Sequence, residues 1–414
     1  MTKNKIKNSI GIIILIFLTI SIFAKSGILK ELDEIAAIIS IMVLLIAFIT
    51  SNLSKSIFKI LILSFLLILC GLLSNLISGI NRSFFSILVD ILTVCKPFWI
   101  FGAMLYLVSN EALHFIRQKF VFLIKSLIFI TYIFFILNEL SLIHMSNGYL
   151  LFNIPNFKFV FGFPVAFAIF LFVCLGVLIN DEKNIINQPW VLSIIFLILA
   201  TGKMQSYIFI VIFLGLVALR SSYKKRLQPR RIVLIGLLGI LISLPKIFNY
   251  FLTDAYSPRR LMMFDSFNLL IKYFPLGSGF ATFGSPMASK DYSPIYYQLG
   301  YQYLYGLQPS GNQYNFLNDN WGSSVIGQFG VAGLLIFILL VFTILKLLLI
   351  EKNTTNSNLY VLSGFMGIIS IIFSSSFFTS SEGGLLMAMI AIVFSGNSIN
   401  KDNSFSNNIS YTSN

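Results

Sequence analysis

Residues 57–77 read IFKILILSFLLILCGLLSNLI, an almost wholly apolar run whose only charged residue is Lys59. A helix needs about 20 consecutive apolar residues to cross the hydrocarbon core of a bilayer, and this run supplies them. Comparable runs lie at about residues 9–24, 35–50, 84–108, 120–140, 159–179, 189–201, 204–219, 232–248, 323–350, 359–378 and 383–396. This recurrence predicts an all-α integral membrane protein with about twelve transmembrane helices.

The overall composition supports the same fold class. The chain is 57% hydrophobic and only 11% charged, and its mean hydropathy is +0.89, whereas soluble domains carry roughly 25% charged residues. The three cysteines lie in apolar runs and the two histidines have no partner at metal-binding spacing, so we expect neither a disulfide framework nor a metal or cofactor site. We predict one polytopic membrane domain over residues 1–396 and a disordered polar tail over 397–414.

Basic residues between the apolar runs set the expected orientation. The net charge is +14, and the densest basic cluster, RSSYKKRLQPRR at residues 220–231, follows the eighth run. Because loops rich in Lys and Arg stay in the cytoplasm, we predict that both termini are cytoplasmic. The basic cluster is then a topology signal rather than a nucleic-acid site. The same distribution places residues 250–322 outside the cytoplasm.

Residues 250–322 form one long polar loop between the ninth and tenth runs, and they contain 10 of the 17 tyrosines. Long loops on a rigid scaffold commonly carry function. The first part, SPRRLMMFDSFNLLIKYF at residues 257–274, predicts an amphipathic helix that lies along the membrane surface and begins at Ser257-Pro258. The chemistry of the protein is therefore expected in this loop.

The rest of the loop contains glycines and tyrosines suited to ligand contacts. Gly277 and Gly279, in PLGSGFATFGSP at residues 275–286, permit the backbone to come close to a ligand. Tyr292 and Tyr296 belong to a tyrosine-rich run, and tyrosine rings stack well on sugars while their hydroxyls hydrogen-bond to sugar hydroxyls. An aromatic belt at the membrane surface explains the same tyrosines without a ligand.

Several charged side chains lie close to the ends of the predicted spans. Such groups either extend to the membrane surface or face a cavity or a partner. Lys203 differs from the rest because Thr201-Gly202-Lys203 separates the seventh and eighth runs, which form either a tight hairpin or one broken helix. The others are Asp33, Glu34, Arg82, Asp90, Lys96 and Glu382.

The order of these motifs resembles the O-antigen polymerase/ligase-like superfamily of bacterial cell-surface polysaccharide enzymes, and in particular the Wzy-type polymerases. The matching motifs are Arg260-Leu261-x-x-Phe264, Pro275-Leu276-Gly277-Ser278-Gly279, Tyr292-Ser293-Pro294-x-Tyr296 and Asp319-x-Trp321 before Gly327-Gln328-Phe329-Gly330, with Asp33-Glu34 and Thr201-Gly202-Lys203 earlier in the chain. The chain departs from the family at Lys203-Met204, where the family often has Ser-Arg. The loop also lacks the histidine typical of the ligase branch, which favours a polymerase.

The resemblance implies metal-independent glycosyl transfer on the outer face of a bacterial cytoplasmic membrane. The donor would be a glycan on polyprenyl diphosphate, and the acceptor a hydroxyl of a second lipid-linked repeat unit. Arg260 would hold the leaving diphosphate, and Asp319 or Asp265 would orient or deprotonate the acceptor hydroxyl. The expected substrate-binding residues are Arg259, Lys203, Arg82, Gly277, Gly279, Tyr292, Tyr296 and Trp321.

Two other functions remain compatible with the sequence. A ligase would move lipid-linked glycan to a different acceptor. A lipid-glycan flippase or transporter should show two similar halves with broken helices, and we find no convincing repeat. A chain-length regulator and a flippase are expected partners through the resemblance alone. The product implied by the resemblance is O-antigen, capsule or exopolysaccharide.

Overall fold

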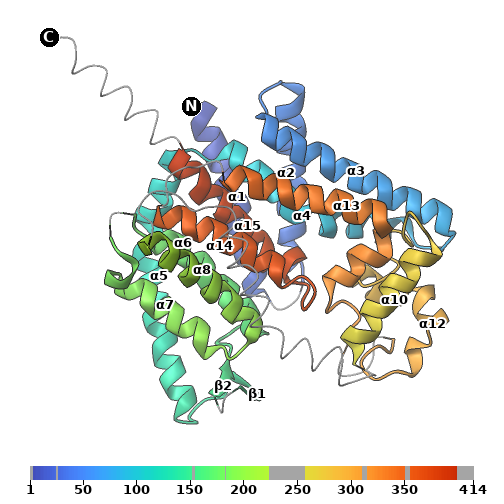
Figure 1. Ribbon diagram of the computed structural model, residues 1–414. Helices are drawn as coiled ribbons and strands as arrows, with labels where there is room; N and C mark the ends of the chain where they lie inside the picture. The colour runs from blue at the N-terminus through green and yellow to red at the C-terminus, as the bar shows by residue number, and fades with distance from the viewer. Residues whose placement is uncertain are drawn as a thin grey trace.

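The computed structural model describes residues 3–24, 27–151, 154–181, 183–222, 257–309, 315–349 and 355–398 (Figure 1). Within these residues, helices occupy eleven of the twelve ranges predicted to be transmembrane, and strands occur only in one short hairpin. The ninth predicted run, 232–248, lies outside the described residues, as do most of the basic cluster and most of the predicted tail.

The helices fall into two groups. Those at predicted spans are α1 (Lys3–Phe23), α2 (Leu32–Ile49), α3 (Lys55–Ser78), α4 (Phe84–Leu107), α5 (Asn110–Glu139), α6 (Pro164–Leu178), α7 (Pro189–Ala200), α8 (Met204–Ser222), α13 (Trp321–Leu349), α14 (Asn356–Ser370) and α15 (Ser381–Ser398). The predicted loop contributes α10 (Pro258–Lys272), α11 (Pro286–Lys290), α12 (Pro294–Gln298) and the 3₁₀ turn η3 (Tyr301–Tyr303). Two further 3₁₀ turns are η1 (Ile185–Asn187) and η4 (Phe377–Thr379).

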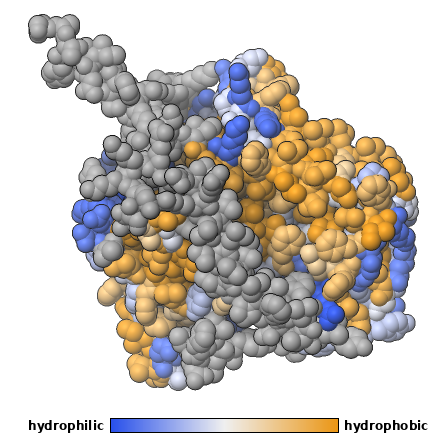
Figure 2. Space-filling model, viewed as in Figure 1, coloured by the Kyte–Doolittle hydropathy of each residue, from blue (hydrophilic) through white to orange (hydrophobic). Residues whose placement is uncertain are grey.

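Six of the described helices are long and apolar enough to cross a membrane. They are Lys5–Phe23, Leu32–Ile49, Lys55–Ser78, Phe84–Leu107, Ala112–Glu139 and Trp321–Leu349. Their outward faces are also apolar: Leu69, Leu73 and Leu76 of α3 are exposed, and Figure 2 shows hydrophobic surface over α3 and α13. A helix facing water would carry polar residues there. The described chain is therefore that of an all-α, multi-pass membrane protein.

Helix α6 begins at Pro164, five residues later than predicted, because a hairpin precedes it. Strand β1 (Ser146–Leu151) pairs antiparallel with β2 (Ile154–Phe157). The ring of Phe157 is fully buried and packs edge-on against Phe167 of α6. Proline is well suited to a first helical position, where its missing N–H leaves no hydrogen bond unmade.

Helix α14 ends at Ser370, although the apolar run predicted a helix to residue 378. Serines compete with the helix for backbone hydrogen bonds: the hydroxyls of Ser374 and Ser375 both donate to the carbonyl oxygen of Ile371, at 3.1 Å. Residues 371–380 therefore form an irregular segment that includes η4. This segment borders both polar clusters described below.

The helices pack around one mainly apolar core. Helix α3 lies along α13, α4 lies between α2 and α15, and α10 packs on the first half of α13 (Figure 1). At the centre, the ring centroid of Trp321 lies 5.1 Å from that of Phe337 and 4.9 Å from that of Phe378, which also contacts Phe98 of α4. This aromatic cluster joins α4, α13 and η4.

Residues 257–309 and 315–320 form a small unit with its own core at one end of the helix bundle. Met262, Phe283, Tyr292, Tyr296 and Tyr301 are buried in that core. The unit is attached to the last turns of α3 and the first turns of α4 and α13. We call this end of the bundle the loop-bearing end.

Candidate functional site

Gly277 and Gly279 fit the loop against helices rather than against open space. A Cβ atom on Gly277 would lie 2.3 Å from the backbone of Gln328, and one on Gly279 would lie 2.5 Å from Asn75 of α3. The N–H groups of Ser278 and Gly279 donate to the carbonyl oxygens of Gly327 and Gln328, at 2.9 and 2.8 Å. These backbone donors are thus used within the protein, which gives the glycines a packing role.

Three aromatic residues expected at a ligand are placed inside cores. Tyr296 is fully buried, and its hydroxyl accepts a hydrogen bond from the N–H of Gly284 at 2.8 Å. Tyr292 is buried and donates to the carbonyl oxygen of Leu307 at 3.0 Å. Trp321 is 2% exposed, within the central aromatic cluster. These side chains hold the fold together, and none presents a ring face to solvent.

Other tyrosines of the loop are open to a ligand. Tyr297, Tyr303 and Tyr305 are all more than half exposed. Sequence reasoning did not single them out, because the short turns around η3 have no periodicity from which the exposed side can be read. They are the exposed tyrosines of the described loop, so a sugar can reach their rings.

Arg82 and Asp90 anchor the loop to the start of α4. Arg82 Nη2 donates to the carbonyl oxygen of Met287 at 3.1 Å and lies 3.6 Å from Asp291 Oδ2, with its side chain 5% exposed. Burial lowers the pKa of the Arg82 guanidinium, and the charge of Asp291 opposes that change. The buried carboxylate of Asp90 accepts the N–H of Ala281 at 2.6 Å. Arg82, expected at the substrate, is engaged in this attachment.

Replacing Arg82 with methionine should loosen the loop unit. The change leaves the carbonyl of Met287 without its donor and Asp291 without its cation, which we expect to lower the free energy of unfolding by about 1–3 kcal/mol. A thermal-unfolding assay in detergent measures the effect. Lys290→Met, which removes an exposed cation from α11, is the control. Equal melting temperatures for the two variants would contradict the anchoring role.

Arg259, Asp319 and Lys203 come together at the loop-bearing end, and we call them the loop cluster. Arg259 Nη2 lies 2.6 Å from Asp319 Oδ2, and both side chains are partly exposed. Lys203 is close enough to Arg259 for their charges to interact. Burial, and secondly the charge of Arg259, lower the pKa of the Lys203 ammonium. The three residues come from three separate parts of the chain.

Local sequence explains how each member of the loop cluster is positioned. Gly202 takes a φ of +63°, and a Cβ there would lie 2.2 Å from Asn156 Oδ1 of β2, so the break between α7 and α8 folds tightly against the hairpin. The break makes the seventh and eighth runs two helices. Pro258 begins α10 and puts Arg259 in its first turn. Asn320 Oδ1 accepts the N–H of Ser323 at 3.2 Å, which caps α13 just after Asp319.

The other two catalytic candidates have different surroundings on α10. The guanidinium carbon of Arg260 lies 5.5 Å from the ring centroid of Phe264, a cation–π contact one turn along the same helix. Asp265 accepts hydrogen bonds from the Tyr301 hydroxyl at 2.7 Å and from Asn268 Nδ2 at 3.1 Å. The contacts of Arg260 and Asp265 are made on α10 and η3, whereas Arg259 pairs with Asp319 just before α13 and its charge acts on Lys203.

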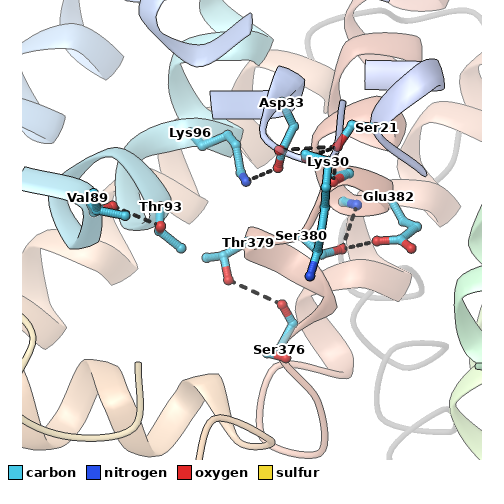
Figure 3. Close-up of polar contacts among 12 residues, drawn as sticks. Ser21, Lys30, Asp33, Val89, Thr93, Lys96, Ser376, Thr379, Ser380 and Glu382 are labelled. Carbon is cyan, nitrogen blue, oxygen red and sulfur yellow. Dashed lines mark hydrogen bonds and ion pairs between the residues drawn. The ribbon is translucent and has the colours of Figure 1, made fainter. Parts of the chain in front are cut away.

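A second polar cluster lies where α1 ends and α2 and α15 begin (Figure 3). Lys96 of α4 forms a buried ion pair with Asp33 of α2. Ser21 Oγ lies 3.2 Å from Asp33 Oδ1 and 3.0 Å from Ser381 Oγ, and Ser380 donates to Glu382 at 2.5 Å. Asp33, Lys96 and Glu382 are separate charged residues near the ends of predicted spans, and the fold brings them into one cluster.

We call this second group the helix-end cluster. Its members are Ser21, Lys30, Asp33, Glu34, Thr93, Lys96, Ser376, Thr379, Ser380, Ser381 and Glu382. Among the described residues, no three His, Cys, Asp or Glu side chains are grouped so as to hold a metal ion. Metal-independent chemistry therefore stays a prediction.

Comparison with known proteins adds no assignment: no family model matches the chain, and no curated protein matches it.

Proposed function

We propose that the protein is a bacterial cell-surface polysaccharide polymerase that joins polyprenyl-diphosphate-linked repeat units at the outer face of the cytoplasmic membrane. The observation that supports the proposal is the loop cluster, in which Arg259 pairs with Asp319 at 2.6 Å and its charge acts on Lys203. Two cations beside one carboxylate suit a diphosphate. Guanidinium and ammonium groups bind phosphate oxygens through short, charge-assisted hydrogen bonds.

In the proposed reaction, Arg259 and Lys203 hold the diphosphate of the donor, with Arg260 beside them on α10. The bond between the anomeric carbon and the diphosphate oxygen breaks, and the diphosphate leaves with the electron pair. Stabilising that developing charge lowers the barrier. The acceptor hydroxyl oxygen forms the new bond to the anomeric carbon.

Asp319 takes the proton of the acceptor hydroxyl in this scheme. Its carboxylate is paired with Arg259 at 2.6 Å in the structure. When the donor diphosphate binds Arg259, it competes for the same guanidinium and leaves Asp319 available as a base. Substrate binding thus prepares the base. The lipid chains would lie against the apolar helix surfaces, and the exposed tyrosines would contact sugars.

Deletion of the gene, followed by complementation, tests the proposal by resolving surface polysaccharide on a gel. A polymerase deletion leaves single repeat units attached to the surface, and the wild-type gene restores long chains. Accumulation of full-length polymer on its lipid carrier would indicate a ligase instead. Loss of all polymer, with repeat units held on the cytoplasmic face, would indicate a flippase and remove the proposed catalytic roles.

A further inference from the structure

We propose that the helix-end cluster is the acceptor subsite, which binds the hydroxyl-bearing end of the second lipid-linked glycan. This proposal rests on the proposed function, because a polymerase joins two lipid-linked glycans and must bind both at once. The loop cluster takes the diphosphate of one of them. The helix-end cluster has the position and chemistry to take the sugar of the other.

The Lys96–Asp33 ion pair is buried, and it joins the middle of α4 to the first turn of α2. Lys96 is twelve residues after Phe84, where α4 begins, which is about 18 Å along a helix. Its side chain is 5% exposed. A buried ion pair adds little stability compared with apolar residues of the same size, and charged groups within spanning helices usually serve a function. The Lys96 ammonium has three donors, and Asp33 is the one acceptor found for it among the described residues.

The cluster has a buried floor and an accessible rim. Thr93, Lys96 and Thr379 are buried, whereas Lys30 is exposed and Ser376 is half-buried. In Figure 3, the polar atoms of Thr93, Lys96 and Thr379 contact Val89, Asp33 and Ser376. An acceptor sugar bound here would replace the contacts of the two threonine hydroxyls with contacts to its own hydroxyls.

The charges of the helix-end cluster favour a sugar over a diphosphate. The cluster contains two cations, Lys30 and Lys96, and three carboxylates. Lys290 of α11 is a third cation, close enough for its charge to act on Glu34. Glu31 also acts on Glu34 and adds a fourth carboxylate, so carboxylates outnumber cations by one and an anion gains no net attraction there. A neutral glycan, whose hydroxyls both donate and accept, fits this mixture of ammonium, carboxylate and hydroxyl groups. The three carboxylates of the cluster are those of Asp33, Glu34 and Glu382.

The two clusters border the same aromatic contact. Asp319 precedes Trp321 by two residues, and Thr379 directly follows Phe378, while the Trp321 and Phe378 rings lie 4.9 Å apart. The chain segments that carry Asp319 and Thr379 are therefore held side by side by this pair of rings.

Two substrate analogues separate the subsites in an assay with the purified protein in lipid nanodiscs. A repeat unit methylated on its non-reducing sugar can only donate, and a repeat unit joined to its lipid through a non-cleavable phosphonate can only accept. The double variant Thr93→Val with Thr379→Val removes two floor hydroxyls and keeps the ion pair. We expect the acceptor KM to rise about tenfold, as for two lost hydrogen bonds, with donor KM and Tm unchanged.

A charge exchange separates ligand binding from structural support. Asp33→Lys combined with Lys96→Asp restores an ion pair but moves the ammonium to α2. We therefore expect the exchanged protein to fold and to bind the acceptor more weakly than the wild-type protein does. Full acceptor affinity in the exchanged protein, or an unchanged acceptor KM in the double threonine variant, overturns the acceptor subsite alone. If the wild-type protein joins no donor to any acceptor, that result contradicts the proposed function itself, and the acceptor subsite that rests on it as well.

Discussion

Replacing Arg259 with alanine is expected to lower the rate of polymer formation by at least about 100-fold, the usual cost of removing one donor that stabilises developing charge. In the structure Arg259 reaches Asp319 at 2.6 Å and its charge acts on Lys203. Its loss removes the only guanidinium of the loop cluster and leaves Asp319 without its cation. Arg259→Lys should recover part of the rate, because a point charge replaces the planar fork incompletely.

The measurement is initial rate with purified enzyme and lipid-linked repeat units, supported by chain length on a gel after complementation. Lys272→Ala is the matched control, since it removes an exposed cation from the other end of α10 and should keep the wild-type rate. A near-normal rate for Arg259→Ala would exclude Arg259 from the donor site. If only Arg260→Ala abolished polymer formation, Arg260 of the sequence motif would be the residue that binds the diphosphate.

Which of these two arginines faces Asp319 could not be predicted from the sequence. Successive residues on an α-helix point about 100° apart, so one of Arg259 and Arg260 faces α13 and the other does not. The motif indicated Arg260, whereas the ion pair with Asp319 and the effect of its charge on Lys203 single out Arg259. That contact depends on the tight break at Gly202, the hairpin beneath it and the cap of α13. None of these is visible in a local pattern of apolar residues.

The helices themselves were predictable because spanning a bilayer demands long apolar runs. The hairpin at residues 146–157 was missed, since its short strands carry no strong alternation. The end of α14 was placed too late, because an apolar run does not show that the serines of 374–375 will take up backbone hydrogen bonds. The helix-end cluster was visible only as scattered charges. Long-range packing had to place α1, α2, α4 and α15 side by side.

Replacing Gly330 with alanine is expected to have the largest effect on folding. Gly330 has φ +60° and ψ −155° inside α13, a region open essentially to glycine, where another residue costs about 1–3 kcal/mol. A Cβ atom there would also lie 2.4 Å from the backbone of Leu276, and backbone cannot move aside as a flexible side chain can. Total stability of a domain is only about 5–15 kcal/mol.

The break at Gly330 holds the loop unit by an exchange of hydrogen bonds. In an unbroken helix the N–H of Ala332 would donate to the carbonyl of Gln328. Here Ala332 donates to Pro275 at 3.1 Å, and the Gln328 carbonyl accepts the N–H of Gly279 at 2.8 Å. If α13 became a straight helix, Ala332 and Gln328 would bond to each other, and the loop would lose its hydrogen bonds to both residues. We therefore expect Gly330→Ala to give little monodisperse protein in detergent and rapid proteolysis within residues 274–285.

Gly300→Ala is the control for a glycine with positive φ. Gly300 has φ +72° and ψ 16°, in the left-handed helical region, and a Cβ there meets nothing within 4 Å, so its replacement carries a smaller backbone strain and no clash. We expect Gly300→Ala to fold and to melt close to the wild-type temperature, whereas Gly330→Ala should not fold. A well-folded Gly330→Ala protein that resists proteolysis would show that the loop is held by other contacts, with Arg82 and Asp90 the first to examine.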